Sequence, residues 1–139
     1  MKYHSTNYSG GIEEFARMLV VSSSGASELL IVSPDKIDSL DGVVTKAFGA
    51  AVWKLLFKER KVHVAELGLT IFLEASRTKS AFKKGNVFLP MAAMHTVESA
   101  INDYRTVNTF YLPHSGPNTG YGIDELTVYL KKYRDSKEI

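Results

Sequence analysis

A chain of 139 residues that is 45% hydrophobic and 23% charged is long enough for one globular domain, so we expect residues 1–139 to form a single domain. The absence of Cys excludes disulfides, thiolate metal sites and a Cys nucleophile. No apolar run reaches the roughly 18 residues of a membrane span and the N-terminus lacks the apolar core of a signal peptide, so we expect a cytoplasmic protein with no membrane partner.

The N-terminal part predicts two helices on either side of a short apolar run. Residues 12–21 follow a Gly-Gly turn and carry apolar side chains at helical spacing. The inner face of this helix comprises Ile12, Phe15, Ala16 and Leu19. Residues 29–32 suit either a strand or a buried helical turn. Ser33 and Pro34 then predict a short helix through Leu40.

The middle of the chain, from Val43 to Ser76, is strongly apolar and contains no Pro. This run predicts two buried helices that are separated by a break near residues 59–61. In the first helix one face is expected to pack on the core, and it comprises Val44, Phe48, Ala51, Val52 and Leu55. Apolar side chains occupy two faces of the second helix, which is therefore expected at the centre of the core.

The C-terminal half predicts a basic, exposed connector over residues 77–86 and a helix that begins at Pro90. A strand is expected over residues 109–112, followed by a turn-rich loop over 113–122. The last helix, residues 124–133, should bury Leu126, Tyr129, Leu130 and Tyr133. Together these elements predict a mainly α fold, a compact helical domain of about five or six helices with two or three short strands.

Two His-x-x-Glu pairs, His63 with Glu66 and His95 with Glu98, are candidate metal ligands because each pair can share one helix face. Dimetal helical bundles use the reverse order, Glu-x-x-His, together with further Glu residues from other helices. Acidic residues are also frequent enough in this chain for two matches to arise by chance. We therefore predict no metal site and no cofactor.

The loop over residues 113–122 is a candidate ligand site because its glycines leave backbone N–H groups accessible ahead of a helix N-terminus. Its candidate binding residues are His114, Ser115, Gly116, Thr119 and Gly120. The glycine spacing matches neither the P-loop nor the dinucleotide-binding pattern, and the loop contains no Lys. A small-ligand or nucleotide-binding protein is therefore one alternative for the function, and an ordinary surface connection is the other interpretation of this loop.

Basic residues interleaved with aromatic residues predict a nucleic-acid interface, within a chain whose net charge of +2 is mildly basic. Single strands bind in cationic grooves in which aromatic side chains stack on bases. The candidate residues are Lys54, Lys58, Arg60, Lys61, Arg77, Lys79, Phe82, Lys83 and Lys84. Among them, Phe82 is expected to be an exposed stacking residue, since it lies in a polar connector between Lys79 and Lys83.

The lack of Cys, the basic middle and the Ala16-Arg17-Met18-Leu19-Val20 helix resemble the small helical subunits of archaeal CRISPR effector complexes. This resemblance implies a non-catalytic subunit that lies along nucleic acid beside other protein subunits. No set of nucleophile, base and orienting group is recognisable, so no catalytic residue is predicted. The leading hypothesis is a non-enzymatic, nucleic-acid-associated subunit of a larger complex, and a further alternative is a protein interaction module without nucleic acid.

Overall fold

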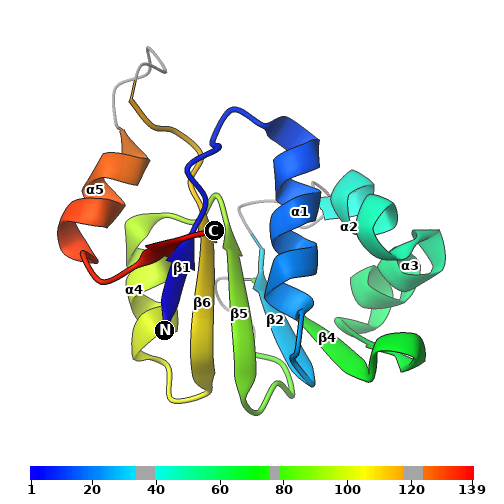
Figure 1. The fold of residues 1–139 in the computed structure, drawn as a ribbon. Helices are drawn as coiled ribbons and strands as arrows, with labels where there is room; N and C mark the ends of the chain where they lie inside the picture. Colours follow the sequence, from blue (N-terminus) through cyan, green and yellow to red (C-terminus); the bar gives the residue numbers. More distant parts are fainter. Residues whose placement is uncertain (34–39, 76–78, 118–123) are drawn as a thin grey trace.

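The computed structural model describes residues 1–33, 40–75, 79–117 and 124–139. In these residues a mixed sheet lies between two layers of helices (Figure 1). The strands are β1 (Lys2–His4), β2 (Glu28–Val32), β3 (Lys61–Val64), β4 (Leu69–Glu74), β5 (Gly85–Pro90), β6 (Thr106–Leu112) and β7 (Lys137–Glu138). The helices are α1 (Gly11–Ser23), α2 (Asp41–Phe48), α3 (Ala50–Glu59), α4 (Met94–Asn102) and α5 (Glu125–Lys132), with a short 3-10 helix at Ala65–Leu67.

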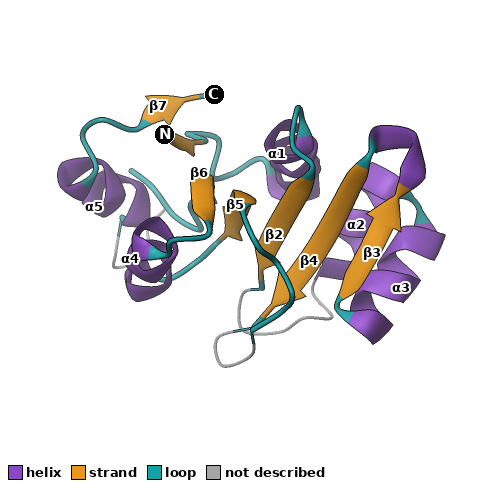
Figure 2. Ribbon diagram, turned by 90° about the horizontal axis from the view of Figure 1, so that it is seen from below, coloured by secondary structure: helices purple, strands orange, loops and turns teal. Residues whose placement is uncertain are grey.

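The strand order in the sheet is β3-β4-β2-β5-β6-β1-β7. Every neighbouring pair is parallel except β3 and β4, which are antiparallel. Helices α1, α2 and α3 pack on one face of the sheet, and α4 and α5 pack on the other. Figure 2 shows α1 and α4 on opposite sides of the sheet. The protein therefore has an α/β fold with helices on both faces.

The prediction of a mainly α domain with two or three short strands was wrong. Strands buried on both faces form continuous apolar runs, and such a run satisfies helical spacing as well as strand alternation. The region expected to be the second central helix contains β3 and β4. In β4, Ile71 and Leu73 pack toward the α1 side and Phe72 packs toward the α4 side. The two apolar faces attributed to one helix are thus the two faces of a strand.

The first middle helix is divided at Gly49, whose φ of 96° is readily available only to glycine. Gly49 separates α2 from α3, so the apolar face that was predicted for one continuous helix does not continue from α2 into α3. Val44 is fully buried on α2, whereas Leu55 on α3 is 50% exposed. The helix expected from Pro90 begins instead at Met94, because Pro90 ends β5.

Several local predictions are confirmed. Helix α1 buries Phe15, Ala16 and Leu19, although Ile12 at its start is 49% exposed. Residues 29–32 form a strand, which decides between the two alternatives, and residues 109–112 belong to β6. Helix α5 buries Leu126 and Tyr129, and Tyr133 directly after it is also buried, whereas Leu130 is only half-buried. Most of the predicted helix from Pro34 to Leu40 lies outside the described residues.

Within the described part of the chain, no helix has the length and apolar character needed to cross a membrane.

The C-terminal segment packs on β1 through a buried histidine. His4 is only 4% exposed, and its Nδ1 lies 2.8 Å from Ser136 Oγ, which is also 2.8 Å from the Tyr129 hydroxyl. Burial lowers the pKa of His4, and the nearby Glu138 carboxylate offsets this only in part. The fold therefore favours the neutral imidazole.

We expect the free energy of unfolding to decrease as the pH falls below about 6.5, the ordinary pKa of His. Below this pH the unfolded chain binds a proton at His4, whereas in the folded chain His4 stays neutral until the pH reaches its lowered pKa. The contribution of neutral, buried His4 to stability is therefore fully present above about pH 6.5. Urea unfolding of His4→Asn between pH 5 and 8 should show a weaker dependence of stability on pH than wild type. Equal slopes for His4→Asn and wild type would contradict this assignment.

Candidate ligand site

The carboxyl ends of two adjacent strands, β2 and β5, lead to opposite faces of the sheet. The chain continues from β2 to α2 on the α1 side, and from β5 to α4 on the other side. The carboxyl ends of β2, β5 and β6 point to the top of the view in Figure 1. In open α/β sheets, the crevice at such a change of direction is the usual place for a ligand.

A cavity of about 420 Å³ occupies this position, and we call it the crevice. Val32 and Ser33 line it from the end of β2, and Ala75 from the end of β4. Four further segments contribute the other lining residues, which are Met91, Ala92, Ala93, His95, Thr96, His114 and Glu125. The crevice therefore combines residues from the ends of two neighbouring strands with residues from the segments on the α4 side of the sheet.

The polar groups of the crevice include several hydrogen-bond donors. His95 and Thr96 lie in the first turn of α4, where the helix dipole favours negative charge. Within the described residues, no acceptor lies in hydrogen-bonding position to the backbone N–H groups of Met94 and His95. On the other side, the His114 N–H donates to Glu125 Oε2 over 3.4 Å. The α4 side of the crevice thus suits an anionic group.

Met91, at the edge of the crevice, has a left-handed backbone conformation with φ of 51°. A non-glycine residue in this conformation is uncommon, and such residues concentrate at functional sites. The Met91 N–H donates to Leu112 O over 2.7 Å, which holds the strained residue to the end of β6. At Met91 the backbone turns from β5 toward α4.

A second, smaller pocket of about 170 Å³ lies beneath α4, and we call it the α4 pocket. It shares Val32, Ala75, His95 and Thr96 with the crevice, so the two spaces are neighbours. Its apolar lining includes Leu30 and Val87, two buried residues that face the α4 side of the sheet, together with Ala100 of α4.

A buried ion cluster closes the far side of the α4 pocket. Arg105 Nη1 donates to Glu74 Oε2 over 2.8 Å, and Arg105 Nη2 donates to Asp103 Oδ2 over 2.8 Å. Ser80 donates to Glu74 through both its backbone N–H and its hydroxyl. Phe82 lies below the guanidinium, 5.4 Å from ring centroid to Arg105 Cζ. The cluster ties the connector after β4 to the start of β6.

The ion cluster shifts the pKa of each of its charged groups. Hydrogen bonding from Arg105 lowers the pKa of Asp103 to about 2. Burial raises the pKa of Glu74, but hydrogen bonds from Arg105 and Ser80 outweigh it and leave the pKa below its ordinary value. Hydrogen bonds to Asp103 and Glu74 raise the pKa of Arg105. All three groups are therefore charged at neutral pH.

The structure brings one residue of the predicted loop site, His114, to the crevice. Ser115 is buried, and its hydroxyl accepts a hydrogen bond from the Glu125 N–H at the start of α5. Gly116 packs closely against the Tyr8 ring. Thr119 and Gly120 lie outside the described residues. Ser115 and Gly116 therefore contribute to packing at the start of α5.

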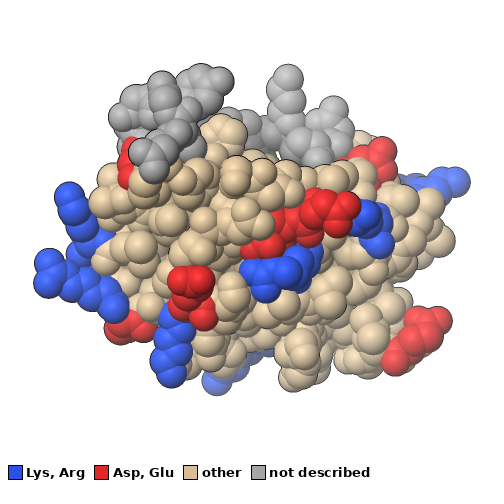
Figure 3. Space-filling view, turned by 45° about the horizontal axis from the view of Figure 1, so that its top comes forward, with Lys and Arg blue, Asp and Glu red and all other residues tan. Residues whose placement is uncertain are grey.

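The predicted nucleic-acid residues lie in two separate regions. Lys54 and Lys58 are exposed on α3, and Arg60 and Lys61 are exposed where α3 meets β3. The connector carries exposed Lys83 and Lys84, together with Lys79, whose Nζ lies 3.8 Å from Asp103. Arg77 lies outside the described residues. On the face in Figure 3, basic and acidic groups are interspersed and form no continuous basic patch.

The prediction that Phe82 is an exposed stacking residue was wrong. Its side chain is only 3% exposed, and its ring lies 5.9 Å from the Phe72 ring in an edge-to-face contact. The connector buries this residue because Phe82 packs against Phe72 of β4 on the α4 side of the sheet. Phe57 on α3, in contrast, is 44% exposed.

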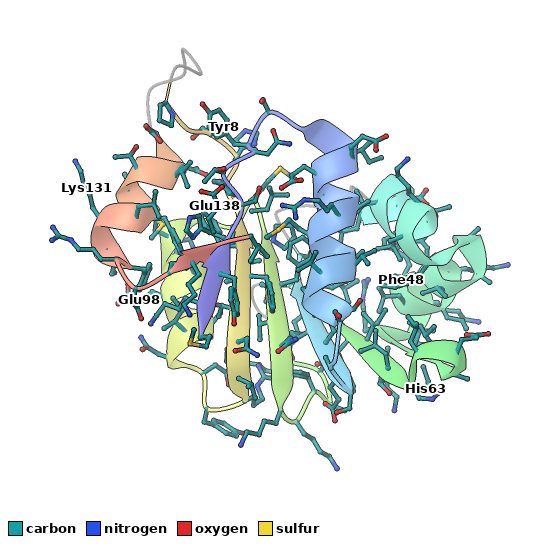
Figure 4. The ribbon with its side chains drawn as sticks, viewed as in Figure 1. Tyr8, Phe48, His63, Glu98, Lys131 and Glu138 are labelled. Carbon is teal, nitrogen blue, oxygen red and sulfur yellow. The ribbon has the colours of Figure 1, made fainter. Side chains whose placement is uncertain are left out.

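The two His-x-x-Glu pairs do not face each other. His63 lies on edge strand β3, whereas Glu98 lies on α4, and Figure 4 shows them at opposite ends of the molecule. Glu98 pairs instead with Lys132 at 2.9 Å. In the described ranges, no three His, Asp or Glu side chains are grouped closely enough to hold a metal ion.

Among the residues of the crevice that sequence reasoning did not assign to a ligand site are Ser33, Met91, Thr96 and Glu125. These residues belong to four different segments that only the strand order brings together. Pro90 was the one local sequence feature that could have located the crevice, because it ends β5, but it was interpreted as the start of a helix.

Comparison of the chain with family models, curated proteins and solved structures yields no match.

Proposed function

We propose that the protein binds a small anionic metabolite in the crevice at the carboxyl ends of β2 and β5. The observation that carries this proposal is the coincidence of a cavity with the point where the chain connections diverge to opposite faces. Its volume of about 420 Å³ falls within the range of small-molecule sites. The donors at the start of α4 favour a phosphate or carboxylate group.

Thermal unfolding in the presence of AMP, ATP, NAD, glucose 6-phosphate and phenyl phosphate tests this function. A ligand at about 100 times its Kd stabilises the folded state by about 2.7 kcal/mol, which raises the Tm by several degrees in a domain of this size. Ala93→Trp should abolish the shift because Ala93 lines the crevice. The matched control is Ala51→Trp, an exposed alanine of α3 that should retain it. A panel without any shift, or an equal shift in Ala93→Trp, would contradict the proposal.

A second candidate function is association with single-stranded nucleic acid through α3 and β3, as a subunit beside other proteins. It is favoured by Lys54, Lys58 and Lys61, which are exposed and have no ionic partner among the described residues. The Arg60 guanidinium lies over the exposed Phe57 ring at 5.4 Å. Cations around an exposed ring are the groups that hold unstacked bases.

If this surface binds nucleic acid, a fluorescein-labelled dT20 strand should bind with an affinity that decreases steeply with salt. Lys58→Glu with Lys61→Glu should weaken binding about tenfold at low salt, because two phosphate contacts are replaced by repulsion. The control pair Lys131→Glu with Lys137→Glu has the same charge change on the opposite side of the sheet. Equal loss in both pairs, measured by anisotropy, would show only a general charge effect.

A further inference from the structure

We propose that the metabolite bound in the crevice carries one compact apolar group, no larger than a single ring, and that the α4 pocket holds this group. The inference rests on the proposed function and specifies the ligand class of that same site. The pocket adjoins the crevice at His95 and Thr96, so one molecule can extend from the anion-binding donors to the space beneath α4.

Apart from His95 and Thr96, which also line the crevice, the polar side chains around the α4 pocket have partners within the protein. The Ser99 hydroxyl donates to His95 O over 2.9 Å, and the Thr106 hydroxyl donates to Ala100 O over 2.7 Å. Glu74 and Arg105 bind each other, and each has further hydrogen bonds. A polar ligand group would have to break these bonds, whereas an apolar group leaves them intact.

The other lining residues of the α4 pocket are apolar. Leu30 and Val87 from the sheet and Ala100 from α4 are buried with exposed fractions of 9% or less. The volume of about 170 Å³ is close to the roughly 150 Å³ of an engineered apolar cavity that binds benzene. A phenyl ring or a branched aliphatic group therefore matches the space.

Titration of the protein with phenyl phosphate and methyl phosphate, followed by NMR, tests this assignment. The two probes share the anionic group and differ only in the apolar group. We expect phenyl phosphate to bind at least about tenfold more tightly, a difference of about 1.4 kcal/mol. Its ring protons should show NOEs to the methyl groups of Leu30, Val32 and Val87.

Ala100→Leu should remove the preference for phenyl phosphate, because the larger side chain fills the α4 pocket, and should leave methyl phosphate binding unchanged. Binding of both phosphates to wild type with equal affinity would overturn the ligand class while leaving the proposed function intact. A preference that survives in Ala100→Leu, or NOEs to other methyl groups, would also overturn it. The NOEs decide the question even if Ala100→Leu does not fold. Failure of both probes to bind would reject the anion site and this inference together.

Discussion

Replacing Arg105 by Met should lower the free energy of unfolding by about 3–5 kcal/mol, because it leaves the Glu74 carboxylate buried without its cationic partner. The two side chains are 8% and 6% exposed and their closest atoms are 2.8 Å apart. Met has a similar length, so the lost volume is small and the uncompensated charge dominates the effect. Urea unfolding at pH 7 measures the change.

Two further variants separate charge from packing at this cluster. Arg105→Met with Glu74→Leu should be more stable than Arg105→Met alone, because no buried carboxylate is then left unpaired. Arg134→Met, at an exposed arginine outside the ion pairs of the described residues, should change stability by less than about 0.5 kcal/mol. If Arg105→Met lowers the free energy of unfolding by less than about 1 kcal/mol, the ion cluster does not stabilise the fold in the way proposed.

Phe82→Ala should cost about 3–5 kcal/mol, which is the usual range for removing a buried aromatic ring. The ring is 3% exposed, contacts Phe72 and lies beneath the Arg105 guanidinium. Phe57→Ala, at a ring that is 44% exposed, provides the matched control and should cost about 1 kcal/mol or less. Unfolding curves for the two variants give the comparison. A neutral Phe82→Ala would restore the interpretation of this residue as an exposed stacking platform.

Periodicity predicted the elements that are amphipathic and exposed on one side. Helices α1 and α5 each bury one face and expose the other, and their inner residues Phe15, Leu19, Leu126 and Tyr129 were identified correctly. Strands β4 and β5 are covered on both faces, and their apolar runs lack the alternation that distinguishes a strand. Only the strand pairing, which is a long-range property, separates them from buried helix.

The crevice was beyond sequence reasoning for a related reason. Its residues come from the segments that follow β2, β4, β5 and β6 and from the starts of α4 and α5, and their proximity depends on the order of parallel strands. Once a parallel sheet is known, the position of the site follows from where the connections change sides. The predicted loop site contributed His114 because that residue lies two positions after the carboxyl end of β6. The resemblance to helical CRISPR subunits relied in part on a basic helical middle, and that region contains the strands β3 (Lys61–Val64) and β4 (Leu69–Glu74).

The most direct test of the ligand site is to map the amide chemical shifts of the protein as it is titrated with the metabolite that gives the largest thermal shift. The largest changes should fall at Val32 and Ser33, at residues 91–96 and at His114, which surround the crevice. Few changes are expected on α3 and β3. Shift changes confined to residues 54–61, or spread evenly over the chain, would contradict the assignment of the site to the carboxyl ends of β2 and β5.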